Sequence, residues 1–436
     1  MKIPWVILTF LHITISQPSS RCIYGEECWP KESDFFHLAS QLSQPLLHPK
    51  PPGSACYPIN NPSGKCSEAI ENAHNGRWRS GQPGSMQAPF LETFTFPNGT
   101  VSACYINATL GFPCSQGSIP EIGVDARSVQ DVQATVRFAS KHNLRLVVKN
   151  TGAFFLATTT SGGARVVEAF YFECTTLRTS PIVHPSPLQK LLGLTVSAGV
   201  QWYEAYDAAE AQGRTIVGAS GVTVGAAGGW VMGNGNGDLS PRHGLGVDNI
   251  VEFEVVTANG TNLIVNTYKN ADLFWALRGG GGGTYAVVLS ATHITHDLVP
   301  LTAIGGFANF TSPNIAKSVI TEFIRIHPSL ADSGWGGSSF FSQGLLSYLF
   351  AAPNVTVTEA NTILEPFLAF TRNTTGQEVR NDVIPYNSYY AWFSASFSRD
   401  GDTGHNTELG SRLLPRDLSE QDPGKVADIL LALPAT

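Results

Sequence analysis

The sequence has few charged residues. Asp, Glu, Lys and Arg occupy 14% of its 436 positions, whereas soluble domains average about 25%. No run of like charge is present, and the formal net charge is −7, which disfavours a nucleic-acid partner or a polybasic membrane contact. A chain with so little charge needs another source of solubility.

Several catalytic motifs are also missing. The sequence contains no G-K-S/T, no H-E-x-x-H, no G-x-S-x-G and no C-x-x-C, which leaves no basis for a Walker nucleotide site, a zinc protease or an α/β-hydrolase. His293 and His296 lie in A-T-H-I-T-H, which alternates like a strand. We therefore expect them to be surface or hydrogen-bonded histidines, and we predict no metal site.

The first 20 residues are typical of a secretory signal peptide. Lys2 gives a positive start, residues 3–15 are mostly apolar, and residues 16–20 are small and polar. The alternative is a buried N-terminal helix or a short anchor. Secretion also fits the six N-x-S/T sequons, which would add solubilising glycans. They are Asn98, Asn107, Asn259, Asn309, Asn354 and Asn373.

Cysteine is almost confined to one end of the chain. Six of the seven cysteines precede residue 115 and only Cys174 follows. In a secreted chain this clustering predicts up to three disulfides in an N-terminal extension at 21–116, with a connectivity that the sequence leaves open. A metal site is the alternative for these cysteines. Cys174 is expected to be a buried free thiol.

A regular pattern begins near residue 117. Ser128 and Asp131 form a capping-box pattern before an amphipathic helix, and residues 144–148 read as a strand. Lys149-Asn150-Thr151-Gly152 follows at once. Such a loop can offer backbone N–H groups to phosphate oxygens, although a simple polar turn fits equally well.

Two glycine-rich stretches point to a cofactor. Ten of the 29 residues at 218–246 are glycine, with apolar residues between them, so this stretch is not a flexible linker. Residues 279–283 are five consecutive glycines between a helical run and a β-rich run. Bare backbone of this kind admits a large, flat, anionic ligand. The glycines close a helix instead of opening one, which argues against a nicotinamide fingerprint.

These motifs resemble those of a flavoprotein superfamily. K-N-T-G at 149–152, G-V-T-V-G-A-A-G-G-W at 221–230 and D-L-F-W-A-L-R-G-G-G-G-G-T-Y-A-V-V at 272–288 are similar to the FAD-binding domain of the vanillyl-alcohol oxidase and para-cresol methylhydroxylase superfamily. Within it, the chain resembles the fungal secreted, berberine-bridge-like branch. The cysteine segment with R-W-R at 77–79 resembles fungal proteins labelled isoamyl alcohol oxidase.

The resemblance implies an α+β fold. It places a two-subdomain FAD-binding domain at 117–298, followed at 299–436 by a partial substrate lobe on an antiparallel sheet, with the family's final segment missing. Carried over by motif position, the FAD-contacting residues are Asn150, Thr151, Gly152, Ala153, Phe154, Gly221, Val222, Thr223, Gly225, Gly228, Gly229, Gly233, Asn234, Gly235, Leu239 and Val247.

Two tethering side chains of the family are absent. Ala153 stands where the family usually has the histidine that bonds FAD covalently, and no cysteine lies near Gly221 to supply the second tether. The resemblance therefore implies non-covalent FAD. An aromatic cluster between Tyr386 and Phe393 could face the substrate, although core packing is the favoured interpretation for each ring.

The predicted function is that of a secreted FAD-dependent oxidoreductase. It would oxidise a small alcohol or a secondary-metabolite intermediate by hydride transfer to the flavin, with dioxygen as the acceptor. The alternative is a catalytically weak or inactive accessory protein with a flavin fold. The sequence identifies neither the substrate nor a catalytic base.

Overall fold

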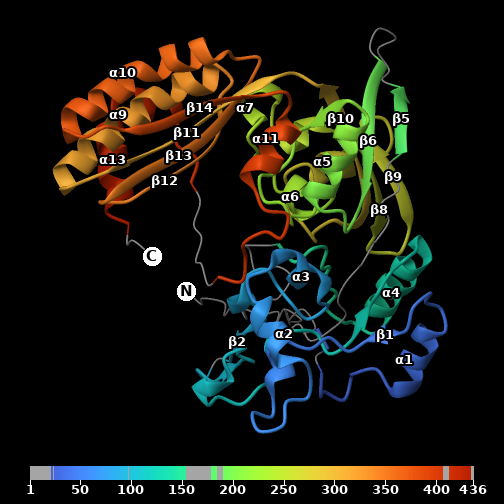
Figure 1. The fold of residues 1–436 in the computed structure, drawn as a ribbon. Coiled ribbons are helices and arrows are strands. Elements are labelled where there is room, and N and C mark those ends of the chain that lie inside the picture. The colour runs from blue at the N-terminus through green and yellow to red at the C-terminus, as the bar shows by residue number, and fades with distance from the viewer. Residues whose placement is uncertain are drawn as a thin grey trace, which may run out of the picture.

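A computed structural model describes residues 21–22, 24–96, 98–153, 178–183, 190–405 and 412–433, with the backbone alone at 178–183 and 190–191. The predicted signal peptide, Phe154 and Cys174 lie outside these residues. The described chain forms three regions (Figure 1). The N-terminal extension lies at the bottom of the view, a central sheet with its helices at the upper right, and a helix-covered sheet at the upper left.

The N-terminal extension consists of short elements held by disulfides. The predicted disulfides are confirmed, and each joins sequence neighbours: Cys22–Cys28, Cys56–Cys66 and Cys104–Cys114. Such staples compensate for a small apolar core. The elements are α1 (Glu32–Ala39), β1 (Leu46–Leu47), η1 (Pro52–Cys56), α2 (Cys66–Glu71), α3 (Gly76–Gly81), η2 (Pro89–Glu92), β2 (Phe94–Thr95), β3 (Val101–Ser102) and η3 (Ala108–Leu110), with β2 paired to β3.

The predicted helix after residue 128 is confirmed, but the strand after it is wrong. β4 (Gly123–Val124) pairs with β1, and α4 (Val129–Lys141) begins with the expected capping box of Ser128 and Asp131. Residues 145–148 are not in a strand, and Leu144 makes only a single bridge to Cys22. The apolar pattern there is right, but no neighbouring strand extends the pairing.

The central sheet is antiparallel throughout. Its order is β5 (Arg178–Val183), β6 (Lys190–Ser197), β10 (Ala286–Asp297), β8 (Ile250–Thr257) and β9 (Asn262–Asn266), and β7 (Arg214–Ile216) pairs with the end of β10. Ala258-Asn259-Gly260, which in the sequence alone is a hairpin signal, forms the turn between β8 and β9. The remaining elements are α5 (Trp202–Ala211), α6 (Gly229–Met232), α7 (Ser240–His243), η5 (Gly246–Asn249) and α8 (Ala271–Leu277).

The third region is a four-stranded antiparallel sheet with helices on one face (Figure 1). Its order is β12 (Gly336–Phe341), β13 (Leu345–Pro353), β11 (Leu301–Asn309) and β14 (Arg380–Tyr386). The helices are α9 (Pro313–Asp332), α10 (Val357–Thr375), α12 (Arg416–Gln421) and α13 (Pro423–Leu431). α11 (Tyr389–Ser396) instead packs against α5 of the central region.

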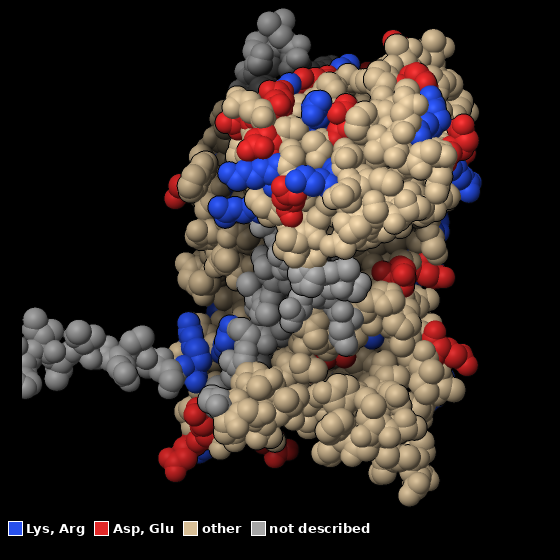
Figure 2. All heavy atoms as spheres, turned by 90° about the vertical axis from the view of Figure 1, so that its left-hand side faces the viewer, with Lys and Arg blue, Asp and Glu red and all other residues tan. Residues whose placement is uncertain are grey.

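The low charge of the sequence is visible on the surface. Lys, Arg, Asp and Glu are interspersed over the upper part of the face shown in Figure 2, and large areas below carry none. Among the described residues, no helix has the length and apolar character needed to cross a bilayer.

Candidate cofactor site

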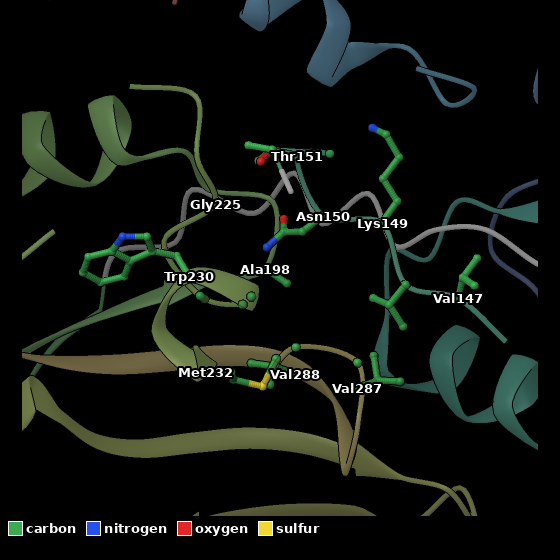
Figure 3. Close-up of a pocket in the computed structure, with 18 of the residues that line it drawn as sticks. Val147, Lys149, Asn150, Thr151, Ala198, Gly225, Trp230, Met232, Val287 and Val288 are labelled. Atoms are coloured by element: carbon green, nitrogen blue, oxygen red, sulfur yellow. The ribbon is translucent and has the colours of Figure 1, made fainter. Parts of the chain in front are cut away.

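The main candidate site is a pocket between the loop after α4 and the glycine-rich segments of the central region (Figure 3). Residues 146–153 line one side, and Ala198 with residues 224–232 and 282–288 contribute the rest. The K-N-T-G loop and the two glycine-rich segments singled out in the sequence thus line one cavity. The lining is mainly backbone and apolar side chains.

Asn150 is the polar side chain at the centre of this pocket. It points from the loop toward Gly225 on the opposite wall (Figure 3). A Cβ atom at Gly225 would lie 2.7 Å from Asn150 Nδ2, and one at Gly228 would lie 2.9 Å from the same atom. Only glycine leaves room for the amide at these positions. Among the described residues, the buried Asn150 Oδ1 has no hydrogen-bond partner.

Close packing also explains why glycine is needed in the five-glycine run at 279–283. A Cβ at Gly282 would lie 2.9 Å from Gly229 Cα, and Gly281 N donates to Met232 O at 3.0 Å. The two glycine-rich segments therefore approach each other at backbone distance. Gly282 and Gly283 also line the pocket.

The structure brings part of the predicted cofactor set together. Asn150, Thr151, Gly152, Ala153, Gly225, Gly228 and Gly229 line the pocket. The other described members do not: Gly221, Val222, Thr223, Gly233, Asn234, Gly235, Leu239 and Val247. Of these, Val222 and Leu239 belong to the hydrophobic core, and Thr223 is buried with its hydroxyl 3.3 Å from Gln87 Oε1. Their contact with FAD stays a prediction.

Several lining residues were not among the FAD-contacting residues predicted from the sequence. They are Leu146, Val147, Val148, Lys149, Ala198, Val224, Ala227, Trp230, Met232, Gly282, Gly283, Ala286, Val287 and Val288. Most are apolar residues beside the glycine motifs, so proximity in sequence was a usable signal for them. Ala198 lies far from both motifs, and no sequence signal marks it.

Lys149 is the one charged residue among the described residues that line this pocket, and its ammonium group points away from the cavity (Figure 3). The side chain is buried, and Nζ donates to Ser80 O in the N-terminal extension at 3.1 Å. This lysine therefore fixes the loop to the extension. The pocket's polar groups are neutral, which suits phosphates held by backbone N–H groups.

A buried ion pair stabilises the segment of the N-terminal extension that contacts the K-N-T-G loop. Arg79 and Glu92 form an ion pair, and Arg79 Nε also donates to Met86 O at 2.7 Å. Glu92 accepts from Met86 N at 2.8 Å. The segment they hold reaches the loop directly, because Gln87 N donates to Gly152 O at 3.0 Å.

The aromatic cluster of α11 is core, as favoured from the sequence. Tyr389, Trp392 and Phe393 are buried and pack against α5. Tyr389 donates its hydroxyl to the buried carboxylate of Asp238 at 2.9 Å. Burial raises the pKa of Tyr389 well above its ordinary value. This tyrosine is therefore unsuited to act as a general base.

The two histidines of A-T-H-I-T-H lie on β10, as the alternation predicts. His293 is fully buried with Nε2 3.1 Å from Ala226 O, and the half-buried His296 has Nε2 2.8 Å from Asn249 Oδ1. Burial lowers the pKa of each to about 4. Both rings thus hold neighbouring loops, and His293 supports the glycine segment behind the pocket.

Comparison with known proteins assigns the chain to a family. Residues 120–266 match the model of a family described as FAD binding domain. An uncharacterized FAD-linked oxidoreductase of Arthroderma benhamiae is 34% identical over 98% of this chain and 75% of its own length. The chain belongs to the FAD-linked oxidoreductases of the vanillyl-alcohol oxidase superfamily.

Other relatives of this FAD-linked oxidoreductase agree. The VAO-type flavoprotein oxidase VAO615 of Thermothelomyces thermophilus is 32% identical over 92% of this chain and 69% of its length. The crystal structure of the VAO-type flavoprotein MtVAO615 from Myceliophthora thermophila C1 superposes with a TM-score of 0.81 at 29% identity. It covers 94% of this chain and 75% of that one. The α+β fold and the family are thereby confirmed.

Proposed function

We propose that this protein is a secreted oxidase of the fungal berberine-bridge-like branch that oxidises a small alcohol or a secondary-metabolite intermediate and holds FAD without a covalent bond. The observation that carries the proposal is the pocket in which Asn150 and the glycines at 225 and 228 meet. A VAO-type flavoprotein oxidase among the relatives supports the oxidase reaction.

The residues of the pocket fit FAD. Asn150 Oδ1 is buried with no hydrogen-bond partner in the part of the chain that the structure describes, and such atoms are rare unless a ligand or water satisfies them. The glycines that line the cavity carry no side chain that would keep a diphosphate from their backbone N–H groups. Ala153 lines the pocket where the resemblance expects the tethering histidine, and a methyl group can form no bond to the cofactor.

FAD, when bound, supplies the hydride acceptor and the reaction with dioxygen. The chain's own residues bind and orient the cofactor. Asn150 and the K-N-T-G backbone would hold polar groups, while Trp230, Met232 and Val288 form apolar walls that exclude water from the cavity. Among the described tyrosines, Tyr389 donates its hydroxyl proton to Asp238, and its raised pKa keeps it protonated, so it does not take the proton of the substrate.

The decisive experiment is a flavin spectrum of the purified, secreted chain, followed by peroxide measurement with a panel of small primary alcohols. We expect bound flavin and substrate-dependent peroxide. Asn150→Ala should lower flavin occupancy, whereas Asn314→Ala on the exposed face of α9 should not. A well-folded protein that binds no flavin after incubation with FAD would contradict the proposal and favour an accessory role.

A further inference from the structure

Two histidines that are far apart in the sequence meet on the surface of the molecule. The rings of His74 and His405 stack with centroids 4.5 Å apart and planes inclined by 23°. Asp402 lies beside them, and one donor atom of each of the three residues lies within 4.8 Å of the other two. All three side chains are exposed, so solvent ions reach them.

Hydrogen bonds orient both rings. His74 Nδ1 is 2.9 Å from Thr403 O, and because a carbonyl oxygen only accepts, this nitrogen carries the proton. His74 Nε2 is then left with a free lone pair. His405 Nε2 is 2.9 Å from Asp402 Oδ1. For His74, the Thr403 carbonyl on one imidazole nitrogen is the usual outer partner of a metal-binding histidine.

Backbone hydrogen bonds join the chain segment around His74 to the segment at 400–405. Thr403 N donates to His74 O at 3.1 Å and Gly76 N donates to Gly401 O at 3.0 Å. Gly404 N donates to Gln87 O at 2.8 Å, and a Cβ at Gly404 would lie 2.0 Å from Ala73 O. The side chains therefore project from a fixed frame, which lowers the entropic cost of bringing them to one ion.

We propose that His74, Asp402 and His405 form a binding site for one zinc-type divalent cation. Two imidazole nitrogens with one carboxylate oxygen suit Zn²⁺ and Cu²⁺, whereas Mg²⁺ and Ca²⁺ prefer oxygen ligands alone. Water completes the coordination. This site is separate from the pocket of Asn150 and does not depend on the oxidase proposal.

The bound ion would link the N-terminal extension to the segment at 400–405. Each of these two segments contacts Thr223 of the glycine-rich stretch. A Cβ atom at Gly76 would lie 2.9 Å from the side chain of Thr223, and one at Gly401 would lie 3.0 Å from it. The cation would thus stabilise the contact of both chain segments with Thr223. A ligand that binds only the folded state raises its stability.

The test is calorimetric titration of ZnCl₂ into the full, untagged, disulfide-bonded chain treated with chelator. We expect one equivalent to bind and the midpoint of thermal unfolding to rise. His74→Ala and His405→Ala should abolish that equivalent, and His37→Ala on exposed α1 should retain it. MgCl₂ should give no such signal.

A second measurement does not depend on any variant folding. Electron paramagnetic resonance of the wild-type chain with one equivalent of CuSO₄ should show two imidazole nitrogens on the metal. Absence of stoichiometric Zn²⁺ binding, or equal binding by the His74→Ala, His405→Ala and His37→Ala chains, would overturn the site. A copper spectrum without nitrogen coupling would do the same.

Discussion

The amide of Asn150 occupies space that two glycines of the opposite wall leave open. Its Nδ2 would be 2.7 Å from a Cβ at Gly225, which is closer than packed carbon and nitrogen atoms approach. A side chain at Gly225 must therefore displace Asn150 as well as obstruct any ligand. This contact could not be read from the sequence, where the two residues are separated by more than seventy positions.

Gly225→Ala is expected to lower flavin occupancy, because the added methyl group pushes the Asn150 amide into the space predicted for FAD. Gly225→Val should have a larger effect. The ratio of flavin to protein absorbance after purification measures both. Gly424→Ala is the matched control, since a Cβ there meets no atom within 4 Å. Full occupancy in the folded Gly225→Val protein would show that this wall does not hold the cofactor.

Any flavin in the purified protein is expected to be dissociable, because Ala153 offers no atom that could bond to it. Acid precipitation should release the yellow colour into the supernatant. Flavin that stays with the pellet would contradict this prediction. Ala153→His tests whether position 153 faces the isoalloxazine ring, and colour retained by that variant alone would show that it does.

At the scale of elements, the N-terminal extension supports the K-N-T-G loop. The buried Arg79–Glu92 pair holds the segment that bonds Gly152, and Lys149 reaches into α3 through Ser80. Two disulfides flank this pair in the sequence, Cys56–Cys66 before it and Cys104–Cys114 after it. The cysteine-rich extension therefore stabilises the loop that lines the predicted cofactor pocket.

Arg79→Met should destabilise the fold by about 3 kcal/mol, since it leaves the Glu92 carboxylate buried without its partner. Urea unfolding measures the loss, and faster amide exchange at residues 149–152 would locate it in the loop. Arg416→Met removes an exposed pair with Asp332 and should cost much less, because solvent screens such a pair. Equal losses in the two variants would show that the buried pair has no special role.

At the scale of the whole molecule, buried histidines make stability depend on pH. Burial lowers the pKa of His293 from its ordinary 6.5 to about 4, so the unfolded chain binds a proton in this window that the folded chain does not. The free energy of unfolding therefore falls as the pH drops from 6.5 to about 4. His293 alone contributes roughly 3 kcal/mol to that decline.

Urea unfolding at several pH values checks this contribution. His293→Gln should show a shallower loss of stability across the window, although it is less stable than the wild type at neutral pH. His37→Gln, whose side chain is exposed, should keep the wild-type slope. An unchanged slope in the His293→Gln protein would mean that another group controls acid unfolding.

The sequence by itself determined the features that depend on neighbours in the chain. The capping box of Ser128 and the turn at Asn259-Gly260 follow from local hydrogen bonding and from the residue types that form turns. The glycine motifs likewise indicated a large, flat, anionic ligand, because backbone exposure is a property of residue type, and their resemblance to a known family implied FAD. Three disulfides were expected from the cysteine count, although their pairing was not.

Only the tertiary structure decided which distant groups meet. Residues 145–148 have a strand pattern but no strand, because pairing needs a partner that the local sequence does not specify. Asn150 faces Gly225, Lys149 turns away from the pocket to Ser80, and His74 meets His405 across 331 positions of chain. Each of these contacts depends on how the regions pack, and packing is set by long-range complementarity that no single segment contains.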